Sequence, residues 1–155
     1  AEYIDIIGLY MSELIPKGTP AVETIERIRE QGGIPYLPHP YAAGRKGAGG
    51  RFAEMLAPLC DVVEVFNARL HQPKQNQLAE KLAGRHASLR GGGSDAHTLR
   101  EVGSVSVAVQ PHPNQASALL VALATGKVRG TVSPHTVHLA STWAKLRKKL
   151  PISLN

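Results

Sequence analysis

Short strand-type runs that alternate with helix-type segments restrict most strongly how this chain can fold. The expected strands are residues 4–11, 34–37, 62–66, 88–90 and 105–109, and the expected helices are residues 19–32, 52–59, 73–85, 114–125 and 137–149. Strands alternating with helices predict a mostly parallel sheet with helices outside it. Because such strands are buried on both faces, they are expected to be continuous apolar runs, as IDIIGLYM and VVEVF are. We therefore expect an α/β fold with mostly parallel strands and outer helices.

Proline and glycine mark the expected ends of the first and third helices. Thr19 is a candidate N-cap with Pro20 at the first helical position, and Gly32-Gly33 is a typical helix end. Pro73 is expected to begin the helix that runs to about Arg85. The sequence contains no internal repeat and no linker, so a single domain is expected across residues 1–155.

Composition limits the core and the cellular context. A chain of 155 residues is long enough to bury a core, and with 5% aromatic residues that core must consist mainly of Ala, Leu and Val. The single cysteine, Cys60, excludes an internal disulfide and is expected to be a buried small side chain rather than a nucleophile. Because the sequence has no apolar stretch of membrane-spanning length and no signal-peptide pattern, we expect a cytoplasmic protein.

The positive charge is concentrated at the C-terminal end. Residues 1–126 carry 12 Lys and Arg against 12 Asp and Glu, whereas residues 127–155 carry the other 6 basic residues and no acidic one. Such an end can contact nucleic acid or an acidic partner. It is also what a solvated helix end looks like, because basic side chains suit the C-terminal turns of a helix. Both interpretations are open, although no aromatic residues are interleaved for base stacking.

Two polar motifs follow expected strands. His39 lies between Pro38 and Pro40 after the run 34–37, and Ser94-Asp95-Ala96-His97 follows the run 88–90 and three glycines. The carboxyl ends of parallel strands meet at one edge, so these side chains are expected to converge. Imidazole and carboxylate groups together suit Zn, Mn or Fe. The spacing alone leaves a metal site and ordinary surface histidines equally open.

Three segments taken in order, GGIPYLPHPY, VVEVFNAR and GGGSDAHTLREVG, resemble the second half of a PHP (polymerase and histidinol phosphatase) domain. The stretch IDIIGLYMSELIPKG resembles the segment just before them in that family. The resemblance covers about residues 4–109, and SDAH followed by Glu101-Val102-Gly103 is its most specific part. The basic, helical part at 110–155 lies outside it.

The resemblance implies the C-terminal part of a distorted (β/α)7 barrel. In that family two or three divalent metal ions (Zn, Mn, Fe or Mg) lie at the carboxyl rim and activate a water against a phosphoester. His39, Asp95 and His97 occupy positions of metal ligands in the family. Asp5 stands where many relatives have a ligand histidine, and a solvated carboxylate is the equal alternative. Glu64 is expected to support a ligand histidine rather than bind metal.

Basic residues near these positions are candidates for holding the substrate phosphate. Arg45, Lys46 and Arg51 lie in or beside the glycine-rich loop 42–50, and Arg69 follows the expected strand 62–66. Glycine allows the backbone to approach a phosphate closely, and guanidinium groups bind it well. A solvated loop without a ligand is the alternative for the first three residues.

The family's earlier motifs, which open with H-x-H and include a bridging Glu, are not in this sequence, so we expect this chain alone to be inactive. In the intact protein the expected function is hydrolysis of a phosphate ester, in a nucleotide, an oligonucleotide or a small phosphomonoester. A non-catalytic interaction or regulatory module of the same family is the alternative. Because strands of the barrel would be missing, an exposed sheet edge and a homodimer are also expected.

Overall fold

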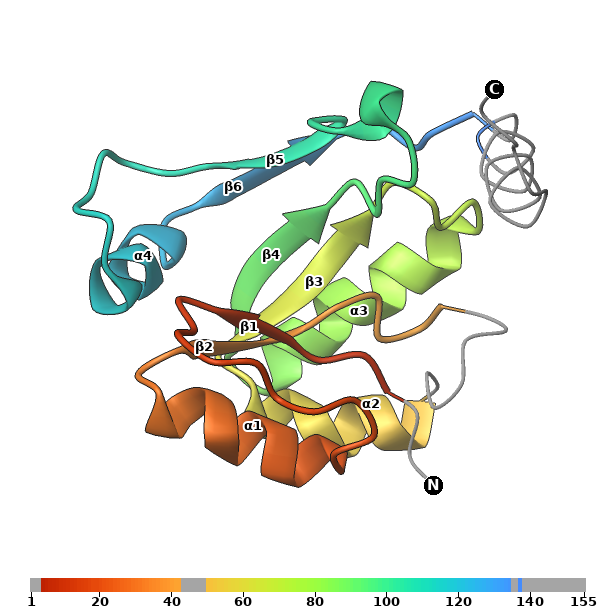
Figure 1. Cartoon of the computed structure of the whole chain (residues 1–155). Helices are drawn as coiled ribbons and strands as arrows, with labels where there is room; N and C mark the ends of the chain where they lie inside the picture. The colour runs from red at the N-terminus through yellow and green to blue at the C-terminus, as the bar shows by residue number, and fades with distance from the viewer. Residues whose placement is uncertain (1–3, 43–49, 135–136, 138–155) are drawn as a thin grey trace, which may run out of the picture.

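The computed structural model describes residues 4–42, 50–134 and 137 of the chain (Figure 1). The elements in order are β1 (Ile7–Leu9), α1 (Ala21–Glu30), β2 (Ile34–Leu37), α2 (Gly50–Leu56), η1 (Ala57–Leu59), β3 (Val62–Asn67), α3 (Pro73–Arg85), β4 (Leu89–Gly93), η2 (Leu99–Glu101), β5 (Val105–Ala108), α4 (Ala116–Leu123) and β6 (Lys127–Gly130). Among these described residues, no helix has both the length and the apolar character needed to cross a bilayer. The predicted helix at 137–149 lies outside the described residues, apart from position 137.

The main sheet has four strands in the order β1-β2-β3-β4. β2 pairs with β3 and β3 pairs with β4 in parallel, with Tyr36 opposite Val62 and Val62 opposite Leu89. The predicted α/β fold with mostly parallel strands and flanking helices is therefore confirmed. The described strands form an open sheet.

β1 differs from the predicted pattern because it pairs with β2 antiparallel, with Ile7 opposite Tyr36 and Leu9 opposite Ile34. Tyr10, which follows the strand directly, turns the chain with a left-handed φ. Residues 10–20 then connect the strand to α1 without a helix or strand of their own. The start of β1, and not its end, therefore lies beside the carboxyl end of β2.

The last strand, β6, was not predicted. It pairs antiparallel with β5 in a separate two-stranded sheet, with Val105 opposite Gly130 and Ala108 opposite Lys127. The run KVRG has one apolar side chain, Val128, and this is too little to show the alternation of a half-buried strand. Pairing with β5, and not hydrophobicity, therefore defines this strand.

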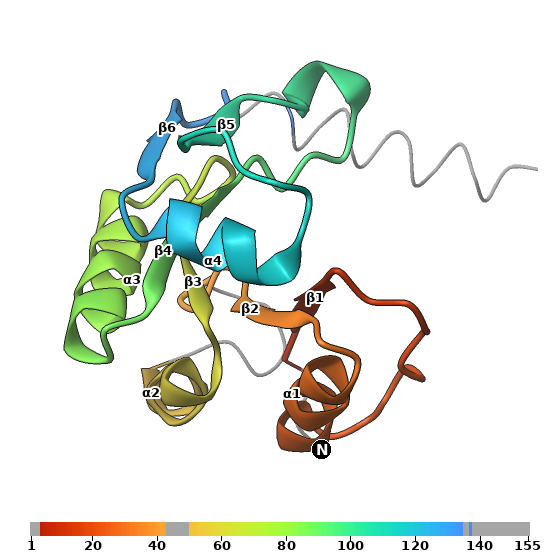
Figure 2. The same cartoon turned by 90° about the vertical axis from the view of Figure 1, so that its left-hand side faces the viewer.

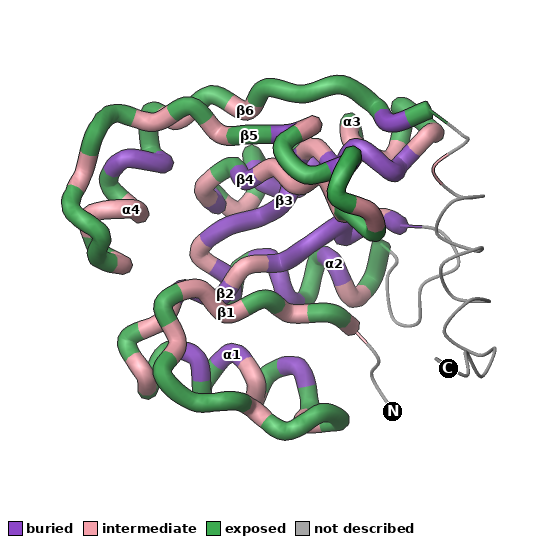
Figure 3. Tube along the Cα trace, turned by 45° about the horizontal axis from the view of Figure 1, so that its top comes forward, coloured by how far each residue is buried: buried purple, intermediate pink, exposed green. Residues whose placement is uncertain are grey.

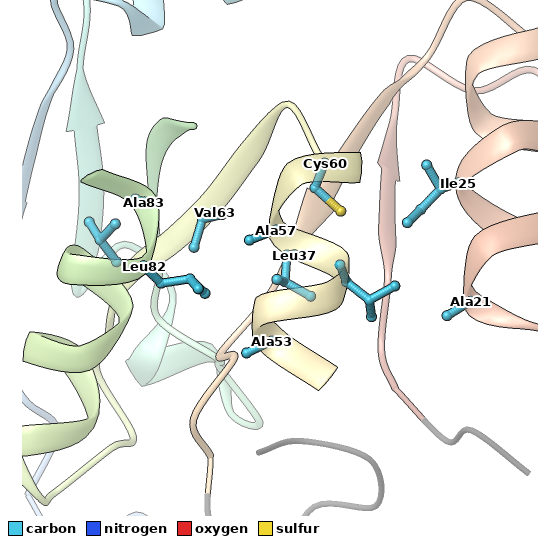
Figure 4. Close-up of a cluster of buried hydrophobic side chains, with 11 residues drawn as sticks. Ala21, Ile25, Leu37, Ala53, Ala57, Cys60, Val63, Leu82 and Ala83 are labelled. Atoms are coloured by element: carbon cyan, nitrogen blue, oxygen red, sulfur yellow. The ribbon is translucent and has the colours of Figure 1, made fainter. Parts of the chain in front are cut away.

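Helices cover both faces of the main sheet. On one face α1, α2 and α3 lie side by side (Figure 2), and their small aliphatic side chains pack with those of β2 and β3 (Figure 4). On the other face Leu123 of α4 packs against Ile34 and Val62. β3, buried along nearly its whole length, is the centre of the molecule (Figure 3). The core consists of Ala21, Ile25, Leu37, Ala53, Leu56, Ala57, Cys60, Val63, Val65, Leu82 and Ala83 in the first cluster, and Ile34, Val62 and Leu123 in the second.

Cys60 belongs to this core, as predicted. Burial, and then the nearby charge of Asp61, raises the pKa of its thiol to about 12. The thiolate is the form that acts as a nucleophile, so a buried thiol with a raised pKa has the character of a structural residue.

The ends of α1 correct one prediction and confirm another. Thr19 is not the N-cap, because its hydroxyl donates to the Pro16 carbonyl oxygen at 2.7 Å, and α1 begins at Ala21 after Pro20. At the other end Gly32 has a positive, left-handed φ, which a residue with a side chain rarely adopts. Gly33 donates its N–H to the Ile28 carbonyl at 2.9 Å, so the glycine pair ends the helix as expected.

Candidate active-site rim

The segments that follow β2, β3 and β4 lie at the same side of the sheet, because these three strands are parallel. We call residues 38–42, 68–71 and 94–98 the carboxyl rim; it faces right in Figure 1. In open α/β sheets ligands bind outside the carboxyl ends of the strands. The rim holds His39, Asp95 and His97, three of the four predicted metal ligands.

Two of these residues have a backbone conformation that side chains normally avoid. His39 and Asp95 both have a positive φ, in the left-handed region. His39 also precedes a proline, which disfavours helical conformations. A non-glycine residue held in this region costs about 1–3 kcal/mol, so the surrounding structure must impose it, and such residues cluster at functional sites. Only two other non-glycine residues of the described chain, Tyr10 and Ala87, share this conformation.

Asp5 reaches the rim because β1 is antiparallel to β2. It lies two residues before β1, and its Oδ2 atom is 3.6 Å from Nε2 of His39. The Asp5 side chain is 65% exposed, whereas that of His39 is 10% exposed. The two side chains form a first donor pair, with the imidazole at the inner end.

Asp95 and His97 form a second pair after β4. Nδ1 of His97 is 2.8 Å from the carbonyl oxygen of Asp95 and 3.9 Å from its Oδ1 atom. The short contact to the carbonyl fixes the ring against its own loop. Both contacts involve Nδ1, and Nε2, the other ring nitrogen of His97, takes part in neither.

The donor types at the rim are imidazole nitrogen and carboxylate oxygen, which Zn, Mn and Fe accept. Among residues 4–42, 50–134 and 137, however, no three His, Cys, Asp or Glu side chains are close enough to hold one metal ion. The described residues therefore provide suitable donors in two separate pairs and do not complete a metal site by themselves.

Glu64 supports His39, but through the backbone. Its Oε2 atom accepts the backbone N–H of His39 at 2.6 Å and the side-chain N–H of Asn67 at 3.1 Å, and the carboxyl is buried. The sequence predicted a carboxylate that supports a ligand histidine, and in the structure this carboxylate holds the main chain of that histidine. Burial, and then the charge of Glu64, raises the pKa of the neighbouring Tyr36 phenol.

The glycine run of β4 makes room for these side chains. A Cβ atom added at Gly91 would lie 2.4 Å from the Tyr36 ring, and one added at Gly93 would lie 1.9 Å from Oε1 of Glu64. Real Cβ atoms do not approach other atoms so closely, so a larger residue at either position would force the Tyr36 ring or the Glu64 carboxylate to move. Glycine within a strand is a signal of close approach that the sequence already carries.

Arg69 of the rim forms a buried ion pair with Glu101. Nη1 of Arg69 is 2.9 Å from Oε2 of Glu101, and their side chains are 5% and 3% exposed. The other carboxylate oxygen of Glu101 accepts the Thr98 hydroxyl at 2.8 Å and the His97 backbone N–H at 3.3 Å. Sequence reasoning did not assign a role to Glu101, although it follows the SDAH motif by four residues.

These contacts decide the ionisation of Glu101. Burial acts to raise the pKa of its carboxyl, but the Thr98 hydroxyl, the Arg69 charge and two backbone N–H groups outweigh burial and leave the pKa below its usual range. The carboxyl is therefore ionised at neutral pH and pairs as a charge with Arg69.

The remaining predicted phosphate-binding residues are only partly covered. Arg51 is exposed on the first turn of α2, whereas Arg45 and Lys46 lie outside the described residues. For all of them, and for Arg69, a contact with substrate phosphate stays a prediction.

The sequence of the helix and strands from α3 to β6 supports the family resemblance. Residues 73–128 match the family described as PHP-associated. Residues 73–128 of this chain are therefore similar to the C-terminal, PHP-associated part of PHP proteins. The family match begins at α3 and includes β4, the SDAH loop and Glu101.

Two proteins of Methanocaldococcus jannaschii, both without an assigned function, are similar in sequence. The uncharacterized protein MJ0417 is 35% identical over 107 residues, which are 66% of this chain and 45% of that protein. The uncharacterized protein MJ1587 is 50% identical over 75 residues, which are 48% of this chain and 42% of that protein. The chain therefore spans less than half the length of these two relatives.

Among solved structures, PsfC from Pseudomonas syringae is similar to this chain with a TM-score of 0.62 and 18% sequence identity. The similarity covers 92% of this chain and 65% of PsfC, and at this identity it concerns the fold alone. The arrangement of sheet and helices described above therefore recurs in a longer protein.

Proposed function

We propose that this chain is part of a metal-dependent phosphoesterase that hydrolyses a phosphate ester. The observation that carries the proposal is the left-handed backbone of His39 and Asp95, each at the exit of a parallel strand and each beside a second donor. The match of residues 73–128 to the PHP-associated family supports the proposal. Segments beyond this chain would provide the remaining ligands and complete a (β/α)7 barrel.

In this proposal His39, Asp95, His97 and Asp5 hold metal, and Glu64 positions His39. When bound, a divalent metal ion supplies Lewis-acid polarisation of a phosphoryl oxygen and a water of lowered pKa. The protein's own part is to fix the donors, since His39 is almost fully buried and its main chain is bonded to Glu64. Arg45, Lys46, Arg51 and Arg69 are the candidates for contact with the substrate phosphate.

Elemental analysis tests the proposal on this chain and on a longer polypeptide that includes the upstream residues encoded by the gene. We expect the longer form to hold two or three divalent ions per chain and to hydrolyse an aryl phosphate, and this chain to hold fewer and to be inactive. His39→Ala or Asp95→Ala in the longer form should lower metal content and abolish hydrolysis. His112→Ala, between β5 and α4 and away from the rim, is the matched control and should change neither.

A longer form without metal and without hydrolysis would contradict the proposal. The alternative, a non-catalytic interaction or regulatory module with the same fold, would then be favoured. Retained hydrolysis in the His39→Ala and Asp95→Ala variants would instead show that the activity resides elsewhere.

We also propose that copies of this chain associate through the outer edge of β1. Within the described sheet β1 pairs only with β2, and Ile7 is exposed at 43%. A strand edge with an apolar side chain is a template for pairing with another chain. Sedimentation across a concentration series is expected to show a dimer of this chain, and Ile7→Lys should weaken it; a monomer at all concentrations would refute the association.

A further inference from the structure

The two donor pairs at the rim are joined by a series of buried polar side chains. From the first pair, the backbone N–H of His39 donates to Oε2 of Glu64, which also accepts from Nδ2 of Asn67. The Oδ1 atom of Asn67 in turn accepts the backbone N–H of Arg69 at 2.9 Å. These contacts lead from the exit of β2 to the exit of β3.

The same chain of contacts continues to the second pair. The Arg69 guanidinium donates to Oε2 of Glu101 at 2.9 Å, and Oε1 of Glu101 accepts from the Thr98 hydroxyl and the His97 backbone N–H. One carboxylate therefore bridges the exit of β3 and the loop that carries Asp95 and His97. We call Glu64, Asn67, Arg69 and Glu101 the buried network.

Burial makes these contacts strong determinants of geometry. All four side chains of the buried network are buried, as is His39. In such surroundings hydrogen bonds are electrostatically stronger than in water, and a polar group that loses its partner has no water to replace it. A displacement at one end of the network therefore costs free energy at the other.

We propose that the buried network consists of positioning residues that couple the His39–Asp5 pair to the Asp95–His97 pair. The coupling rests on the proposed function insofar as both pairs serve one site. Arg69 then acts through Glu101 on the SDAH loop, and its task is to hold that loop rather than to bind substrate. The strained conformations of His39 and Asp95 lie at the two ends of this network, where something must impose them.

Hydrogen exchange of the His39 and His97 amides, measured by NMR on this chain, tests the coupling. Glu101→Gln preserves the shape of the side chain but puts an uncharged group beside Arg69. We expect exchange of both amides to accelerate by at least about fivefold, the change in equilibrium for loss of one buried hydrogen bond. Glu80→Gln is the matched control, since its partner Arg90 lies on the surface, and it should leave both amides unchanged.

A second variant removes a different hydrogen bond of the buried network, the one from Asn67 to Glu64. Asn67→Asp keeps the oxygen that accepts from the Arg69 backbone N–H but replaces the amide NH2 group, which donates to Glu64, by an oxygen. It is expected to accelerate the same two amides, and it remains available if Glu101→Gln does not fold. If either folded variant changes only the nearer amide and leaves the other at the rate of the unmodified chain, the coupling is refuted.

Kinetics of the longer, hydrolytic form separate positioning from substrate binding. Glu101→Gln is expected to lower kcat and leave KM unchanged. A raised KM with kcat unchanged would refute the positioning role and would instead favour a role of Arg69 in substrate binding. The exchange measurement needs neither metal nor hydrolysis. A failure of the proposed phosphoesterase function would therefore leave the exchange result intact, and unchanged exchange would leave the phosphoesterase proposal standing.

Discussion

Replacement of Glu101 by leucine is expected to lower the free energy of unfolding by about 3–5 kcal/mol, the usual cost of removing one partner of a buried ion pair. The substitution takes the countercharge from Arg69 in a place where both side chains are at most 5% exposed. It also removes the acceptor of the Thr98 hydroxyl and the His97 amide. Urea unfolding followed by circular dichroism measures the loss as a lower midpoint with a similar slope.

The surface pair Arg90–Glu80 is the control for this experiment. Its side chains are 46% and 50% exposed. Glu80→Leu should therefore change stability by no more than about 1 kcal/mol. A loss below about 1 kcal/mol for Glu101→Leu would mean that Arg69 reaches water in the variant. That result would argue against a rigid buried network.

Replacement of Leu82 by alanine is expected to cost about 2–5 kcal/mol, because it removes buried methyl groups and leaves a cavity. Leu82 has an exposed fraction of 0% and points from α3 into the cluster with Val63 and Ala57 (Figure 4). Its neighbours are mainly small, so few flexible side chains are available to fill the space. The same urea titration measures the effect.

Leu99→Ala is the matched control, because this leucine in η2 is 92% exposed. A surface substitution of this kind should change stability by no more than about 0.5 kcal/mol. Equal effects of the two substitutions would contradict the packing described for α3. A large loss for Leu82 alone would locate the stability of the chain in the layer between α3 and β3.

The parts of the fold that follow from local chemistry could be predicted from the sequence. The helix 73–85 has the predicted bounds, since Pro73 fixes its first turn and the apolar side chains recur on one face. α4 was expected at 114–125 and spans 116–123. The direction of β1 and the existence of β6 could not be predicted, because each is defined by a partner strand distant in the sequence.

The candidate site divides in the same way. His39, Asp95 and His97 could be found because strand exits are visible in the sequence and parallel strands bring them to one rim. The role of Glu101 could not, since its partner Arg69 is 32 residues away and nothing local distinguishes a buried carboxylate from a solvated one. Glycine at positions 91 and 93 was the clearest sign in the sequence that larger side chains, those of Tyr36 and Glu64, lie close to β4 here.

The short length of β1 affects the order in which parts of the structure unfold. Three residue pairs hold this strand to β2, whereas β3 is paired on both sides and buried. Elements with few pairings open at lower free energy than the whole protein. Because Asp5 lies two residues before β1, it moves away when β1 separates from β2. Local opening that leaves β3 intact will therefore separate Asp5 from His39. The first donor pair therefore exists only for the fraction of time that a peripheral strand is docked, and any molecule that binds across this pair will stabilise the docked state.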